Sequence, residues 1–512
     1  MHIRSWVSGW LTLAVFATVG GVMVASDPAF AKVDMDQLTI GGEVRIRYEI
    51  RNNTSFNSNN SNESAASHRL RVNVGYDLTP DVSFFAQLQD ARIWGNEGST
   101  AAGANTSTGI ASVSSTNQGN TGVDLHQGYI LLKNVLVPGL SVKAGRQEII
   151  FGDHRLFGNF NWSQVGNSFD AVRLTHSMPI GDVDLFWARI ADTESAAGCS
   201  AGAAASCSGV IFPGNNASGR GAATTDQDVY GLYVTLKAIP NWTIEPYLFL
   251  LKDGRTPTTT ITAAQAAGQA RSTVGGRING KAGGLDATAE MAWQTGSISS
   301  GGATAPANDV HINAWAGAFR AGYTMDAVPM KPRVGIEIDY ASGDGCAGQG
   351  PGTGGAGATG GTCKAQGHFN TFDNLFPTNH GKFGYMDLMA WKNQVTYQAV
   401  FDVKPSPVSK LQVNVAIMRL ANRHDNWYRA SQAVYGATGA GNNSSSIGRE
   451  LDIHYWHTFK EKFKFEIGAG HFWAGTYITN GQNTINPNAA GVGATGNGSG
   501  QNWGYVMGSI LF

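Results

Sequence analysis

Polar and apolar residues alternate with a period of two along much of the chain. In "EVRIRYEIR" (residues 43–51), charged side chains occupy the odd positions and valine, isoleucine or tyrosine the even ones. Successive side chains of a β-strand point to opposite faces, so this segment predicts a strand with one charged and one apolar face. The alternation recurs in "RLRVNVGYD" (69–77), "LDATAEMAW" (285–293), "RVGIEIDY" (333–340), "QVNVAI" (412–417) and "ELDIHY" (450–455). The pattern predicts an all-β chain.

About eighteen strand-like segments can be counted, and the links between them alternate in length. The segments start near positions 40, 68, 81, 124, 140, 168, 182, 226, 243, 271, 283, 312, 332, 392, 410, 448, 463 and 502. Links after even-numbered segments are short, such as "TP" (79–80) and "KEK" (460–462), whereas links after odd-numbered segments are long and rich in Gly, Ala, Ser, Thr and Asn.

These link lengths separate two folds that share the alternation. A soluble sandwich would bury the apolar face, whereas a transmembrane barrel turns that face to lipid and lines a lumen with polar residues. Short turns at one end and long loops at the other favour a single transmembrane antiparallel up-and-down β-barrel of about 18 strands, with short periplasmic turns and long extracellular loops. An even number of strands also lets such a barrel close without an exposed edge.

Both ends of the chain fit export to the bacterial outer membrane. Arg4, an apolar run and "AFA" (29–31) have the form of a cleaved signal peptide over residues 1–31, which leaves 32–512 as the barrel domain. The alternative is a membrane-anchoring helix, but no stop-transfer flank follows. The last strand, "NWGYVMGSILF", ends on Phe512 and resembles the C-terminal signal of bacterial barrel proteins. We therefore expect outer-membrane lipid and, through Phe512, the barrel-assembly machinery as partners.

Composition adds two constraints. Charged residues make up 14% of the chain and the formal net charge is −1, so no global field attracts nucleic acid. The four cysteines form two close pairs, Cys199 with Cys207 and Cys346 with Cys363. In an oxidising compartment these predict two local disulfides. Zinc ligation is the alternative, but neither pair has CxxC spacing, and we expect no metal and no cofactor.

The densest charge cluster lies in "GRQEIIFGDHRLFG" (145–158), at the end of the fifth predicted strand. Its acids, arginines and histidine could serve acid–base catalysis. However, no histidine alternates with a serine and an acid on one strand face, and GxSxG and HExxH are absent, so the sequence does not favour an enzyme. We expect instead that Asp153 fixes the turn by pairing with Arg146, Arg155 or an arginine of a neighbouring strand, and that both named arginines line the passage.

An eighteen-stranded barrel leaves an aqueous passage, and charges on its wall bias which solutes pass. Arginine suits anionic solutes because its planar guanidinium binds carboxylate and phosphate groups. The alternative is that the charges pair across the lumen and only solvate the wall. The candidate lining residues are Arg45, Arg47, Arg69, Arg71, Arg146, Asp153, Arg155, Arg173, Arg320, Arg333, Glu337, Asp339 and Arg449.

Several blocks together resemble the alginate-export family of outer-membrane porins. They include "GRQEIIFGDHRLFGNFNWSQVGNSFDAVRL" (145–174), "EIDYASGD" (337–344), "NLFPTNHGKFGYMD" (374–387) and "GRELDIHYWH" (448–457). The resemblance implies a monomeric eighteen-stranded barrel with an arginine-rich constriction that passes an anionic uronate polymer. It carries over to Arg146, Asp153 and Arg155, and it gives structural roles to Trp162, Asp170, Asp344, Phe376, His380 and Asp387. His154 stands where the family often has Gln.

Three functions follow as hypotheses. The first is a channel for passive passage of hydrophilic, anionic solutes. The second is a structural or adhesive barrel whose long loops, including 343–391, bind a partner. The third, which the missing motifs disfavour, is an outer-membrane enzyme.

Overall fold

The computed structural model describes residues 34–56, 62–94, 123–191, 227–253, 269–299, 309–345, 368–439, 441–485 and 498–512. The predicted signal peptide and all four cysteines lie outside these ranges, so both predictions stand as made. At its N-terminal end, the short 3-10 helix η1 (Met35–Gln37) is capped by the Asp34 side chain, which accepts a hydrogen bond from the Asp36 amide. Among the described helices, none has the length and apolar content to cross a membrane.

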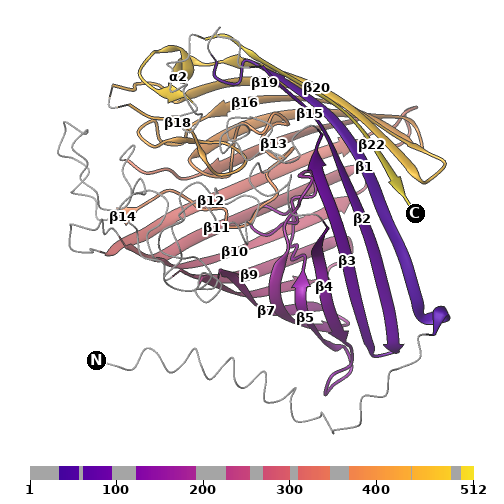
Figure 1. The fold of residues 1–512 in the computed structure, drawn as a ribbon. Helices are drawn as coiled ribbons and strands as arrows, with labels where there is room; N and C mark the ends of the chain where they lie inside the picture. The colour runs from indigo at the N-terminus through magenta and orange to yellow at the C-terminus, as the bar shows by residue number, and fades with distance from the viewer. Residues whose placement is uncertain are drawn as a thin grey trace, which may run out of the picture. The chain divides into compact units, whose positions relative to one another are not determined.

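Eighteen long strands of the described chain form one closed antiparallel barrel within the unit Thr39–Phe512 (Figure 1). Each pairs with the next along the chain, and β22 pairs with β1 to close the sheet. The strands are β1 (Leu38–Asn52), β2 (Glu63–Thr79), β3 (Val82–Ile93), β4 (Asp124–Leu132), β5 (Leu140–Gln147), β6 (Phe169–Met178), β7 (Gly181–Ala191), β8 (Gln227–Leu236), β9 (Trp242–Asp253), β10 (Gln269–Ala282), β11 (Leu285–Ser299), β12 (Asp309–Thr324), β13 (Arg333–Ala341), β15 (Gln394–Ser406), β16 (Ser409–Arg419), β19 (Ser446–Phe459), β20 (Phe463–Ala474) and β22 (Gln501–Leu511). The predicted fold is confirmed, and the largest error in a strand start is 68 against Glu63.

The small elements belong to the links. Strand β14 (His368–Phe369) runs parallel to β12. Strands β17 (Trp427–Tyr428), β18 (Val434–Ala437) and β21 (Thr484–Ile485) form a separate three-stranded sheet, and α2 (Thr476–Thr479) is a single helical turn.

The two faces of the barrel wall follow the sequence alternation. On β1, Arg45 and Arg47 point inward and are buried, whereas Ile46 and Tyr48 are each 47% exposed on the outer face. On β13, Glu337 and Asp339 are buried, and Ile336 and Ile338 face outward. The outer apolar face is the surface that a barrel presents to lipid.

Two links fold into the barrel and bring an apolar core with them. Residues 148–168 connect β5 to β6, and residues 370–393 lead from β14 to β15. The two segments pair through their backbones, because the Gly158 amide donates to Phe376 O at 2.9 Å and the Phe376 amide to Leu156 O at 2.9 Å. The Phe157 ring packs 4.7 Å from that of Phe249 on the inner face of β9. The core of this barrel therefore lies inside it, between the wall and the inward links.

Candidate functional site

Four arginines of β1 and β2 hold the first inward link, residues 148–168, against the wall. Arg45 donates to Asn161 O at 2.7 Å and to Ser163 O at 2.8 Å. Arg47 donates to Trp162 O at 2.8 Å, and its guanidinium carbon lies 4.1 Å from the centre of the Trp162 ring. These carbonyls belong to irregular backbone inside the protein and need donors, which the guanidinium groups supply.

Arg69 and Arg71 continue the same arrangement. Arg69 donates to Ser163 O at 3.2 Å and pairs with Glu43, and Arg71 donates to Val165 O at 3.2 Å and lies 3.6 Å from Glu148. The side chains of Arg45, Arg47, Arg69 and Arg71 are all nearly inaccessible to solvent. They face inward as predicted, but they support the link and do not border an open passage.

Arg155 anchors the same link to another part of the wall, strand β13. Its Nη1 lies 2.8 Å from Asp339 Oδ1, and its Nη2 contacts Glu337 Oε1. Burial alone would lower the pKa of Arg155, but the two carboxylates outweigh it and raise the pKa above its usual value. The group therefore stays charged, and the sequence-predicted Arg155, Glu337 and Asp339 come together as one buried ion-pair cluster.

Asp153 pairs with arginines of neighbouring strands, which was one of the predicted alternatives. Its carboxylate lies 2.8 Å from Arg277 Nη2 and 3.4 Å from Arg320 Nη2. Burial would raise its pKa, but Lys382 and these arginines outweigh that effect and lower the pKa to about 2. Burial, followed by Lys382, also lowers the pKa of His154, so this histidine is neutral at neutral pH.

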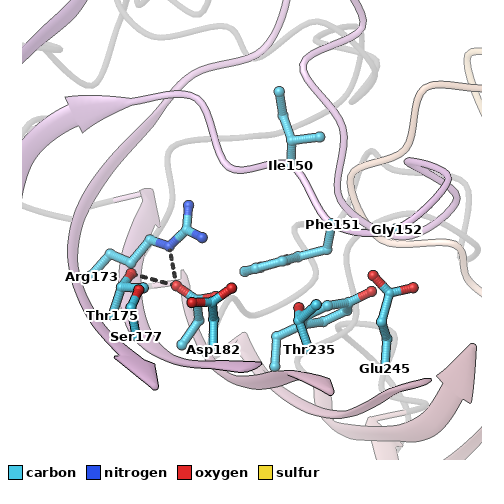
Figure 2. A pocket seen from close by; sticks show the side chains of 11 residues that line it. Ile150, Phe151, Gly152, Arg173, Thr175, Ser177, Asp182, Thr235 and Glu245 are labelled. Atoms are coloured by element: carbon cyan, nitrogen blue, oxygen red, sulfur yellow. Dashed lines mark hydrogen bonds and ion pairs between the residues drawn. The ribbon is translucent and has the colours of Figure 1, made fainter. Parts of the chain in front are cut away.

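A cavity of about 340 Å³ lies inside the barrel beside the inward link (Figure 2). Arg173 Nε donates to Asp184 Oδ1 at 2.8 Å, and the Phe151 ring lies between Arg173 and Thr235 in this view. Phe151 also stacks on Tyr233 with ring centres 4.3 Å apart. The lining residues are Ile150, Phe151, Gly152, Arg173, Thr175, Ser177, Asp182, Asp184, Tyr233, Thr235 and Glu245. The cavity thus combines ion pairs with an aromatic surface.

Arg320 and Arg333 are the other predicted lining residues on this part of the wall. The Arg320 side chain is 35% exposed, and Arg333 binds both oxygens of Asp286, at 2.7 and 2.9 Å. Asp402 lies 3.5 Å from Arg333 and 2.7 Å from Lys410. Positive and negative groups therefore lie side by side on this part of the inner wall.

Two predicted lining residues lie on the outer face, which corrects their assignment. Arg146 forms a two-point ion pair with Asp170, at 2.9 Å for each contact. Asp170 stands between Phe169 and Ala171, which belong to the inner core, so it points away from the lumen. Arg449 is exposed and precedes the buried Glu450. Adjacent strand residues face opposite sides, so neither arginine can line the passage.

The remaining family-motif residues lie in or near the inward segments. Trp162 stacks on His380 with ring centres 3.9 Å apart, and His380 Nδ1 lies 2.9 Å from Asp387. Phe376 pairs with the first link as described above. The Asp344 amide donates to Asp425 Oδ2 at 2.9 Å. These contacts hold the two inward links, residues 148–168 and 370–393, in place inside the barrel.

Sequence reasoning missed Arg277, which pairs with both Glu245 and Asp153. Alternation could have placed Arg277 on the inner face, because it shares odd positions with the buried Arg271 and Thr273. In the described part of the chain, no group of three or more His, Cys, Asp or Glu side chains is arranged to hold a metal.

The closed barrel, its lipid-facing apolar surface and its charged interior define an outer-membrane β-barrel channel. The chain matches the model of the Alginate export family over residues 36–203 and 213–492, and it belongs to that family. The resemblance seen in the sequence is thereby confirmed. No curated protein matches the chain.

Solved structures share the fold at low sequence identity. The outer membrane protein OprD from Pseudomonas aeruginosa is 11% identical, with a TM-score of 0.51 over 96% of this chain and 97% of that chain. Acinetobacter baumannii OccAB2 is 8% identical, with a TM-score of 0.52 over 93% of this chain and 98% of that chain. At these identities the likeness shows the fold alone.

Proposed function

We propose that the protein is a passive channel for small hydrophilic solutes that carry negative charge. The supporting observation is that two inward-facing arginines have guanidinium nitrogens to spare. Among the described residues, the ion pair of Arg173 uses Nε alone, and the polar contacts of Arg320 all go through Nη2. The other N–H donors are available to a carboxylate or phosphate group in the lumen.

The nearby acids limit how strong this preference is. Asp184 lies beside Arg173, and Asp153 lies beside Arg320, so each arginine is partly neutralised. Positive and negative wall charges both act on a passing ion. We therefore expect a moderate preference for anions over cations and no complete exclusion of either.

The ion selectivity of the purified channel in a planar bilayer tests the proposal. Under a KCl gradient, the reversal potential should report chloride preference, and Arg173→Gln with Arg320→Gln should lower the chloride-to-potassium permeability ratio several-fold because the spare donors are lost. Arg449→Gln removes the same kind of charge from the outer face and is the control. Equal permeabilities in the native channel, or the same loss in the control, would overturn the proposal.

Family membership suggests one particular anionic solute, a uronate chain. An oligouronate should block the current of the native channel more than a neutral oligosaccharide of equal length, and Arg320→Gln should weaken this block. Equal block by the two sugars would argue against a channel specific for uronate and leave a general anion channel.

We infer the same cellular setting as the sequence predicts: export by the signal peptide of residues 1–31, assembly through Phe512 and a monomeric barrel. N-terminal sequencing of the protein from purified outer membranes tests the first of these, with Lys32 as the expected first residue.

A further inference from the structure

Two arginines project from the outer face at the end of the barrel where the long links begin. Arg419 is the last residue of β16, and Arg449 lies near the start of the neighbouring strand β19. Arg449 is directly opposite Ile417, which is 46% exposed on the lipid-facing side. Met418 precedes Arg419 and Glu450 follows Arg449 in the chain, and both of these side chains are fully buried. Both arginines therefore point outward from adjacent strands, one diagonal step apart.

These arginines differ from others on the outer face because they have no acidic partner. Arg146 pairs with Asp170 at 2.9 Å, and Arg189 pairs with Asp228 at 2.7 Å. In contrast, neither Arg419 nor Arg449 reaches a carboxylate within the described part of the chain, and Arg419 contacts the Ser445 hydroxyl at 3.2 Å. Two uncompensated positive charges thus lie close together on a membrane-facing surface.

An exposed aromatic side chain lies beside this pair. Arg449 has Ile417 of β16 opposite it on one side and Trp473 of β20 on the other, and Trp473 is 49% exposed. The ring of His471, also on the outer face of β20, packs 4.3 Å from the Trp473 ring centre. Exposed tryptophan at the end of a membrane strand marks the headgroup level, where arginine is tolerated far better than in the hydrocarbon.

We propose that Arg419, Arg449 and Trp473 bind a phosphorylated glycolipid of the outer leaflet. The long-link end of such a barrel faces the outside, so this patch meets the outer leaflet. Two guanidinium groups provide several N–H donors for phosphate oxygens, and a flat indole packs against the sugar and acyl region beside them. This site is on the opposite side of the wall from the lumen and does not depend on which solute passes.

Binding of diphosphorylated lipid A to the full-length barrel in nonionic detergent tests the proposal. An arginine near an anionic lipid surface contributes about 1 kcal/mol, so Arg419→Gln with Arg449→Gln should weaken binding about thirtyfold. Arg419→Lys with Arg449→Lys should retain part of the affinity because charge is kept but forked donors are lost. Heat-modifiable migration on gels reports that each variant is a folded barrel.

Three controls give the proposal clear ways to fail. Arg146→Gln removes an outward arginine that already has a partner, so it should leave lipid A binding unchanged. Dephosphorylated lipid A should bind no better to the native protein than to the double Gln variant. Three results would overturn the proposal. The native and double Gln proteins could bind lipid A equally, or the native protein could bind lipid A and dephosphorylated lipid A equally. Millimolar inorganic phosphate could also displace lipid A.

Discussion

At the scale of single residues, Asp153 connects the inward link to the charged wall, and its protonation is predicted to change stability. Its folded pKa is lowered to about 2, so the folded protein binds fewer protons than the unfolded chain. The stabilisation is complete above the unfolded pKa of about 4 and is lost as the pH falls toward 2. Asp153→Asn should lower the free energy of unfolding by about 2 kcal/mol at pH 7, with the difference vanishing near pH 2.

Urea titrations of the barrel in detergent at both pH values measure this difference. Asp170→Asn is the matched control, because that carboxylate is half exposed on the outer face. A loss that is the same at pH 2 and pH 7 would show that Asp153 acts through packing and not through its charge.

Alternation in the sequence predicted which face most wall residues occupy, but it failed where two charged residues are adjacent. Arg449 is a predicted lining residue, but it stands next to the charged Glu450, and neighbouring strand residues must face opposite sides. The buried Glu450 is the inward one. Pairing partners such as Arg277 for Asp153 could not be predicted, because they are 124 residues apart and meet only when the link folds inward.

At the scale of elements, the decisive contact is the one that fastens the link of residues 148–168 to β13. Arg155 is buried against Glu337 and Asp339, so its removal leaves two carboxylates without their cation. Breaking a buried ion pair of this kind costs about 3–5 kcal/mol. Arg155→Met should release the link, which raises hydrogen exchange across residues 150–160 and increases single-channel conductance. Unchanged exchange with unchanged conductance would show that the aromatic contacts alone hold the link.

The eighteen strands and their order could be predicted because strand period and turn length are local signals. The inward path of the links could not, since their sequence shows no period and their fixed positions depend on long-range contacts. Arg155 meets Glu337 across 182 positions of the chain. For the same reason the arginines of β1 and β2 were expected to border water, whereas the link covers them.

At the scale of the whole molecule, the barrel exists only if its first and last strands meet. The Gly42 amide donates to Phe512 O at 2.8 Å, and the Phe512 amide donates to Gly42 O at 3.2 Å. A Cβ atom at Gly42 would lie 2.2 Å from the carbonyl oxygen of Arg71 and 2.6 Å from the Phe512 ring. The seam between β1, β2 and β22 therefore has no room for a side chain at this position.

Gly42→Ala should consequently reduce the yield of closed barrel, because either the β1–β2 backbone contact or the Phe512 ring has to move. Gly504→Ala is the matched control on the other strand of the seam, where the nearest neighbouring atom would be 3.5 Å from the new Cβ. The folded fraction in outer membranes, measured by heat-modifiable migration on gels, should fall for Gly42→Ala and stay at the native level for Gly504→Ala. Equal folded fractions for the two variants would mean that the seam adjusts at little cost, and that closure is set by the strand ladder without this close approach.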